Sequence, residues 1–176
     1  MNGAQRRNQI ITLLHTTAEP ISGTELAKRL GVSRQVIVQD IALLRAENKN
    51  VLSTNKGYLL FQSADFNGTC RRVFSVRHSN EQLLDELTTI VDLGGRVLDV
   101  SVEHELYGQL CCDLVINNRQ DAQDFAGRMA QCGGSPLKSL TDDRHYHTVL
   151  APSEALLDVI EAALNQKGYL VPTLTD

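Results

Sequence analysis

A glycine between two capped helical segments is the feature that most limits how this chain can fold. Ser22 and Glu25 have the spacing of a capping box, in which each side chain satisfies a free backbone amide of the other. The helix that follows ends at Gly31, because glycine adopts the left-handed conformation without steric cost. Ser33 then caps a second helix, SRQVIVQDIALLRAEN. A short connection that contains glycine is typical of a helix-turn-helix.

The segments on either side extend this motif. Ala4 to His15 has the apolar periodicity of an amphipathic helix, which Glu19-Pro20 ends because the residue before proline avoids the helical region. After Asn48 the pattern changes to VLSTNKGYLLF, two short apolar runs separated by Asn55-Lys56-Gly57. These three residues favour a tight hairpin. We therefore expect a winged helix-turn-helix over residues 1–62.

The charge along the chain is uneven in a way that suits DNA binding. Residues 1–60 carry eight Lys/Arg and four Asp/Glu, whereas the remainder carries nine and 17. The net charge is therefore +4 in the first part and −8 in the second. A basic module joined to an acidic one is expected to direct only the first toward phosphates.

In a helix-turn-helix the start of the second helix enters the major groove, where Arg can contact guanine and Gln adenine. A lysine at the tip of the wing would contact a phosphate. The expected DNA-binding residues are Ser33, Arg34, Gln35, Val38, Gln39 and Lys56. The alternative is a protein-docking module, which explains the basic charge and the Arg/Gln face less well.

The rest of the chain predicts a second domain. A polar segment without periodicity, placed at residues 63–70, is the expected linker. Residues 71–176 follow with strand, helix, strand, strand, helix, strand and a final helix. This order predicts an α+β fold, with a split-βαβ (ferredoxin-like) domain and one extra C-terminal helix.

Composition places few further limits on the chain. No apolar run is long enough to span a bilayer and no signal sequence precedes the first helix, so we expect a cytoplasmic protein with no membrane partner. The four cysteines, Cys70, Cys111, Cys112 and Cys132, lack CxxC spacing. We expect them to be reduced and mostly buried, rather than to bind metal or act in redox chemistry.

The histidines suggest a metal site in the second domain. His145 and His147 lie one residue apart on an expected strand, so their imidazoles share a face. His78 lies where the first strand meets its helix, and Glu81, Asp85 and Glu86 follow. Imidazoles with one carboxylate suit a divalent transition metal such as Zn, Ni or Fe, and not Ca or Mg. The alternative is an exposed strand with an ordinary turn histidine.

Two resemblances add to these inferences. The run GVSRQVIVQDIALLRAEN resembles the winged helix-turn-helix of the biotin-repressor type. One class of those proteins carries a biotin ligase, but the glycine- and arginine-rich adenylate loop of the ligase does not occur in residues 70–176. The resemblance therefore implies DNA binding without ligase activity.

The second half resembles the three-histidine (3H) domain of nicotinate-responsive bacterial repressors of the NiaR type, which control niacin uptake and NAD biosynthesis. The resembling segments are FSVRHS, ELTTIVDLGGRVLDVSVEHELYG and RHYHTVL. The resemblance implies that the metal ligands are His78, Glu86, His145 and His147. Eight residues of helix rise about 12 Å, so Asp85 or Glu81 replaces Glu86 unless the end of the strand turns back over the helix.

The resemblance also implies a mechanism. Nicotinate would act as co-repressor on a homodimer that binds a palindromic operator. His104 and Tyr107 would line the ligand pocket, and Arg77 or Arg144 would pair with the carboxylate. Two alternatives remain open: a metal-sensing repressor without an organic effector, and a metal-dependent hydrolase with Glu86 or Asp85 as base. We expect a regulator and not an enzyme, because no nucleophile motif accompanies the ligands.

Overall fold

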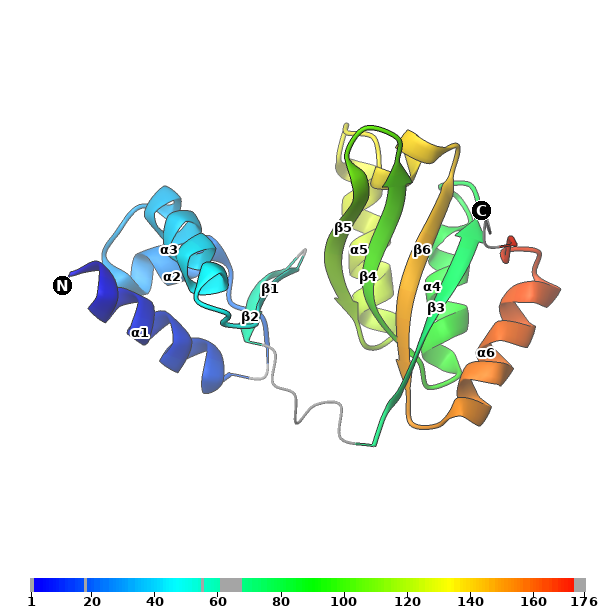
Figure 1. Ribbon diagram of the computed structural model, residues 1–176, viewed down its shortest axis with the longest axis horizontal. Helices are drawn as coiled ribbons and strands as arrows, with labels where there is room; N and C mark the ends of the chain where they lie inside the picture. The colour runs from blue at the N-terminus through cyan, green and yellow to red at the C-terminus, as the bar shows by residue number, and fades with distance from the viewer. Residues whose placement is uncertain (1, 18, 55, 61–67, 173–176) are drawn as a thin grey trace. The chain divides into compact units, whose positions relative to one another are not determined.

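The chain divides into two compact units, Met1–Asn67 and Gly68–Asp176 (Figure 1). The computed structural model describes residues 2–17, 19–54, 56–60 and 68–172, and each unit is described by itself. The linker expected at residues 63–70 falls partly outside this range, because residues 61–67 are not described. Its last residue, Cys70, is already the first residue of a strand.

The first unit is a winged helix-turn-helix, as the sequence predicted. Its three helices are α1 (Gly3–His15), α2 (Gly23–Leu30) and α3 (Arg34–Ala46), and its hairpin consists of β1 (Val51–Thr54) and β2 (Gly57–Leu60). The core between them consists of buried aliphatic side chains from all three helices and from β1. Asn55, part of the expected hairpin turn, lies outside the described residues.

The caps that define the turn have the predicted residues but a simpler geometry. The hydroxyls of Ser22 and Ser33 each accept a hydrogen bond from the backbone amide three residues later. Gly31 has a φ of 66°, which is the left-handed cap expected of it. The carboxylate of Glu25, however, accepts a hydrogen bond from Arg29 (2.7 Å). An i,i+4 ion pair on the helix surface has therefore replaced the second half of the capping box.

The wing is attached to the helices at two points. Ile21 and Tyr58 exchange two backbone hydrogen bonds of 2.9 and 2.8 Å, so the segment before α2 extends the hairpin as a third short strand. At the other end of α3, the Arg45 guanidinium donates to the carbonyl of Val51 and the hydroxyl of Ser53. These contacts attach the wing to the segment before α2 and to the end of α3.

Gly57 is required for this attachment, so Gly57→Ala is expected to destabilise the first unit by about 2 kcal/mol or more. Its φ is 144°, and a Cβ added there would lie 2.4 Å from the carbonyl oxygen of Ile21. Gly31→Ala is the matched control, because it also has a positive φ but no atom within 4 Å of the added Cβ. We expect it to cost about 1 kcal/mol. Chemical denaturation measures both, and equal losses would contradict the steric argument.

The second unit has the predicted element order. It consists of β3 (Cys70–Arg77), α4 (Leu83–Asp92), β4 (Arg96–His104), β5 (Gly108–Ile116), α5 (Arg119–Gln131), a 3₁₀ segment η2 (Leu137–Thr141), β6 (Arg144–Ala151) and α6 (Glu154–Gln166). The α+β class and the extra C-terminal helix are confirmed. The η2 segment was not predicted.

The four strands form one antiparallel sheet in the order β3-β6-β4-β5. Both βαβ units are split by another strand, as expected. In one respect the sheet differs from a ferredoxin-like one, because β6 lies between β3 and β4, where the third strand would otherwise lie. Consequently β6, which carries the HxH pair, runs beside β4 as well as beside β3, and β3 ends at Arg77 just before His78.

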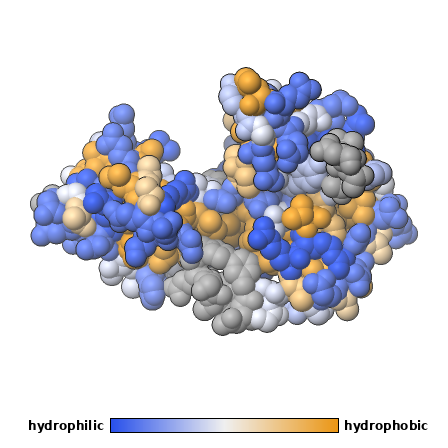
Figure 2. Space-filling model, in the orientation of Figure 1, coloured by the Kyte–Doolittle hydropathy of each residue, from blue (hydrophilic) through white to orange (hydrophobic). Residues whose placement is uncertain are grey.

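Helices cover one face of this sheet. α4 packs against α5 and α6, and together they contact all four strands (Figure 1). The core between the sheet and the helices is aliphatic, with Phe74 and Tyr169 at its margin. Apolar side chains remain interspersed with hydrophilic ones on the visible surface (Figure 2). Among the described residues, no helix is long and apolar enough to cross a membrane.

The cysteines lie differently from the prediction. All four are free thiols, but Cys111, Cys112 and Cys132 are exposed and Cys70 is only half-buried. The expectation of mostly buried cysteines was wrong, because β5 is the edge strand of the sheet and Cys132 follows the end of α5. The adjacent pair on β5 does point to opposite faces, since Cys112 lines a pocket on the helix side.

Candidate metal centre and nucleic-acid interface

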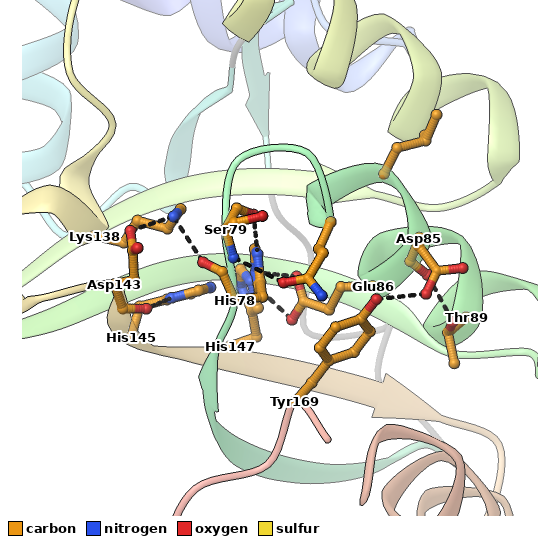
Figure 3. Close-up of polar contacts among 12 residues, drawn as sticks. His78, Ser79, Asp85, Glu86, Thr89, Lys138, Asp143, His145, His147 and Tyr169 are labelled. Carbon is orange, nitrogen blue, oxygen red and sulfur yellow. Dashed lines mark hydrogen bonds and ion pairs between the residues drawn. The ribbon is translucent and has the colours of Figure 1, made fainter. Parts of the chain in front are cut away.

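Four of the predicted residues meet in the interior of the second unit. The sheet register pairs His145 with Val76 and His147 with Phe74, so both imidazoles point to the helix-covered face. His78 follows β3, and Glu86 lies in the first turn of α4. All four side chains are buried, with exposed fractions between 0 and 4% (Figure 3). Burial of three imidazoles around a carboxylate is costly unless something compensates it.

The chain reaches this arrangement because α4 begins later than the sequence suggested. Residues 79–82 form a turn, in which Ser79 and Gln82 hydrogen-bond to each other, and the helix starts at Leu83. Glu86 is thus only one turn into the helix, and the turn before it brings His78 back over it. The 12 Å separation expected for a continuous helix does not arise.

The two alternative carboxylates have other surroundings. Asp85 pairs with Lys167 and accepts a hydrogen bond from the Tyr169 hydroxyl (2.6 Å). Glu81 is exposed. Among the three acidic candidates on this segment, only Glu86 faces the histidines.

Each of the three histidines is oriented by a backbone carbonyl. The Nδ1 atoms lie 2.8 Å from the oxygen of Ser79 for His78, 2.9 Å from that of Asp143 for His145, and 2.6 Å from that of Asp99 for His147. A carbonyl only accepts, so each Nδ1 must carry the proton. When neutral, each ring therefore presents the Nε2 lone pair, which is the usual arrangement of a metal-ligating histidine.

These lone pairs and the carboxylate face one another. His78 Nε2 lies 2.9 Å from Glu86 Oε2, and His147 Nε2 lies 3.5 Å from Glu86 Oε1. In the described part of the chain, none of these four buried atoms has a hydrogen-bond partner of acceptable geometry. Ligand atoms of His78, Glu86 and His145 lie within 4.8 Å of one another. Acceptors that meet in this way require a proton or a cation between them, so this cluster could hold a metal ion.

Protonation equilibria in the cluster follow from burial and mutual charge. Burial, assisted by the charge of His147, lowers the pKa of His145 to about 3. Burial also acts against a charged His147, but the nearby charge of Glu86 raises the pKa of His147 above its ordinary value. For Glu86, burial raises the pKa, yet the proximity of His147 and His78 lowers it overall.

The low pKa of His145 predicts acid sensitivity of the metal-free protein. Below its ordinary pKa of 6.5, His145 binds a proton in the unfolded chain but not in the folded one, so stability falls as the pH falls toward 3. Between pH 7 and pH 5 the expected loss from this residue is about 2 kcal/mol. Urea titrations at both pH values measure it. His145→Asn should lose this dependence, and an unchanged slope in that variant would contradict the assignment.

A pocket of about 190 Å³ adjoins the cluster. Its walls are mostly apolar side chains from α4, α5, β4, β5 and the start of η2, and His145 and His147 belong both to the pocket and to the cluster. Its lining residues are Leu83, Val100, Cys112, Leu114, Phe125, Met129, Pro136, Leu137, Lys138, His145 and His147. The pocket is large enough for a single-ring ligand.

The predicted ligand-binding residues lie outside this lining. Arg77 and Arg144 are paired in the sheet register and alternate with Val76 and His145, so they point to the face without helices. Arg77 also forms an ion pair with Asp142. His104 and Tyr107 lie at the β4–β5 turn, where their rings pack on each other with centroids 5.0 Å apart.

Sequence reasoning missed two residues at the cluster. Lys138 is buried and bonded to the backbone of His78, and Tyr169 packs the edge of its ring on His78 with centroids 5.7 Å apart. Burial, followed by the hydrogen bond to Asp85, raises the pKa of Tyr169 to about 12. No periodicity marks either residue, because each is positioned by an irregular segment.

The predicted DNA-contact residues of α3 lie on its free face. Ser33, Arg34, Gln35, Val38 and Gln39 are all exposed. Lys56, in the wing, is half-buried. The side chains of Arg34 and Lys56 line a polar concavity together with the capped start of α2 at Ser22. Basic side chains beside the free amides of a helix start form a surface that suits a phosphate.

A buried ion pair supports this face from behind. Asp40 lies on the inner side of α3 and pairs with Arg6 and Arg7 of α1, at 2.5 and 3.7 Å. Arg6 and Arg7 therefore anchor α3 to α1, although both contribute to the net charge of +4 of residues 1–60. Part of the basic charge of the first unit is therefore neutralised within the unit.

Comparison with known proteins gives the same two parts. Residues 6–59 match the HTH domain family, and residues 71–173 match the 3H domain family. Over 167 residues the chain is 37% identical to the probable transcription repressor NiaR of Thermotoga maritima, covering 95% of this chain and 94% of that protein. Over 170 residues it is 38% identical to the transcription repressor NadR of Bacillus subtilis, covering 96% and 94%.

The chain belongs to the NiaR/NadR family of transcription repressors. The match extends over both units, so the order of domains in this family is also that of this chain. Both relatives are named as repressors, in agreement with the expectation of a regulator and not an enzyme. DNA binding by the first unit is what a repressor of this family requires.

Proposed function

We propose that this repressor controls genes of niacin uptake and NAD biosynthesis in the cytoplasm, as a homodimer that holds a divalent transition metal and takes nicotinate as co-repressor. The observation that carries the proposal is the buried group of three histidines and Glu86 beside an apolar pocket, in which the Nε2 atoms of His78 and His147 and both carboxylate oxygens lack a hydrogen-bond partner among the described residues. The family relationship supports the repressor part of this statement.

The donor set supports a transition metal. Three imidazoles and one carboxylate match the ligand preference of Zn, Ni or Fe. Ca and Mg prefer sites made of oxygen ligands, and Glu86 is the only carboxylate in this set. His78, Glu86, His145 and His147 are the residues that would hold it. Bound metal would supply a Lewis-acidic centre for an electron-pair donor on the effector.

The pocket supports a small planar effector. Its apolar walls, which include Phe125 and Met129, suit an aromatic ring, and its polar end is formed by His145 and His147. A pyridine carboxylate would place its ring between the walls and its nitrogen or carboxylate toward the histidines. In this arrangement Arg77 and Arg144 have no role, because they point to the other face of the sheet.

A homodimer follows from the size of the DNA-binding surface. One exposed α3 start and one wing contact too few base pairs for genomic specificity, whereas two of them match a palindromic operator. Nicotinate would act by favouring the arrangement in which both heads fit successive half-sites. Light scattering of the free protein tests the dimer.

The test of the whole proposal is operator binding with each component varied. Operator fragments are first selected from genomic DNA in the presence of Ni²⁺ or Zn²⁺ and nicotinate, and affinity is then measured by fluorescence anisotropy. We expect nicotinate to tighten binding by about 10-fold or more, and chelation by EDTA to remove this effect. No response to nicotinate in metal-loaded protein would overturn the co-repressor role.

A metal-sensing repressor without an organic effector is the second candidate. It is favoured by the buried group of His78, Glu86 and His145, which could hold a metal ion without a ligand from an effector. In that case metal alone would change operator affinity as much as metal and nicotinate together. Calorimetric titration of nicotinate into metal-loaded protein would then give no heat. The two candidates therefore differ in one measurement on the same sample.

A further inference from the structure

The η2 segment contributes a buried cation beside the histidine cluster. Lys138 is only 4% exposed, and its ammonium donates a hydrogen bond of 2.8 Å to the carbonyl of His78. It also forms an ion pair with the carboxylate of Asp143 (Figure 3). A lysine is almost never buried without such partners, because removing its charge from water is costly. One of its two partners is the carbonyl of His78 itself, and the other, Asp143, lies two residues before His145.

On one side the lysine fixes the turn that orients His145. Asp142 and Asp143 both have left-handed backbones, with φ values of 53° and 64°. Two successive non-glycine residues adopt this conformation only when their surroundings enforce it. Asp143 is held by Lys138 through its carboxylate and through its amide, which donates to the Lys138 carbonyl. The carbonyl of Asp143 is the acceptor for His145 Nδ1.

On the other side the lysine fixes the end of β3. The His78 carbonyl that it binds is one peptide before the Ser79 carbonyl that orients the His78 ring. The rings of His78 and His145 contact each other edge to face, with centroids 4.8 Å apart. One ammonium group therefore ties together the backbones that orient two adjacent imidazoles.

We propose that Lys138 is a positioning residue for the histidine cluster, which fixes the orientation of His78 and His145 and joins their backbones to the pocket wall. Pro136, Leu137 and Lys138 all line the pocket, so a molecule that enters it contacts the same segment that holds the two histidines. The link to metal and effector rests on the proposed function, but the fixing of the rings does not.

The test compares Lys138→Met with Lys167→Met. Lys167 is the matched control, because it also pairs with an aspartate near the cluster, Asp85, but is not bonded to a histidine backbone. In Lys138→Met we expect Zn²⁺ or Ni²⁺ affinity, measured by competition with a chromogenic chelator, to fall about 10–100-fold. In Lys167→Met we expect less than a twofold change.

A second readout in metal-free protein separates this proposal from the metal site. Ring ¹⁵N NMR spectra show which nitrogen of each histidine carries the proton. In the wild type we expect His78 and His145 to carry it on Nδ1 only, and in Lys138→Met to show a mixture of both forms. Failure of the wild type to bind metal would count against the proposed function, while this spectral change would still support the role of Lys138.

Unchanged ring spectra and unchanged metal affinity in folded Lys138→Met would overturn the proposal. If that variant does not fold, Asp143→Asn gives the same test, because this partner is 44% exposed and its loss leaves the lysine its other acceptor. We expect Asp143→Asn to alter the His145 spectrum and to leave that of His147 unchanged. An unaltered His145 spectrum would overturn the proposal in this variant as well.

Discussion

Glu86→Gln is expected to weaken metal binding by more than about 100-fold. Glu86 is the only acidic residue among the candidate ligands, so its loss removes the attraction of an anionic side chain for a divalent ion. In the metal-free state, by contrast, an amide could donate a hydrogen bond to His78 Nε2, where the carboxylate offers only an acceptor.

Two measurements make this prediction specific. A metal present at about 100 times its Kd should stabilise the wild type by about 2.7 kcal/mol in chemical denaturation and should not stabilise Glu86→Gln. Asp85→Asn and Glu81→Gln are the controls, because they remove the two carboxylates that were alternative ligands. Both should bind metal as the wild type does. Wild-type affinity in Glu86→Gln would remove this residue from the site.

Arg34→Ala is expected to weaken operator binding by about 30-fold or more without a measurable change in stability. Arg34 is exposed at the start of α3 and lines the concavity beside the wing. A base contact by one arginine contributes about 1–3 kcal/mol of discrimination, and the proposed dimer would make two such contacts. Anisotropy with operator and with unrelated DNA measures both the affinity and the specificity.

The matched control is Arg29→Ala. Arg29 is also an exposed arginine of the head, but it lies on α2 and pairs with Glu25. Both variants remove one positive charge, so both change the non-specific attraction to DNA to a similar extent. Only Arg34→Ala should reduce the ratio of specific to non-specific binding. Equal losses in the two variants would mean that Arg34 contributes charge alone.

Local patterns were sufficient for the elements and for the class of each unit. Gly31 and the serines at 22 and 33 act within a few residues of their own position, so their roles as caps are readable without knowledge of the fold. The alternation along β6 likewise places His145 and His147 on one face whatever lies beside that strand. The relationship to the repressor family was visible for the same reason, since it rests on such local motifs.

Other features depend on contacts between segments far apart in the chain. The position of β6 between β3 and β4 places the HxH pair beside both of these strands, and element order alone permits more than one strand order. The late start of α4 is different, because it follows from the local turn at Ser79. Helical rise assumes a continuous helix after His78 and therefore could not give the convergence of Glu86 with His78. Exposure of the cysteines on β5 follows from its place at the edge of the sheet.

The sequence by itself thus determined the two units, the helix-turn-helix between residues 22 and 46 and the residue types of a transition-metal site, because these depend on periodicity and local hydrogen bonding. Only the tertiary structure decided that Glu86 and not Asp85 or Glu81 faces the histidines, and that the buried ammonium of Lys138 is bonded to the backbone of His78. The physical reason is that the direction of a buried side chain is set by the backbone of distant segments packed against it.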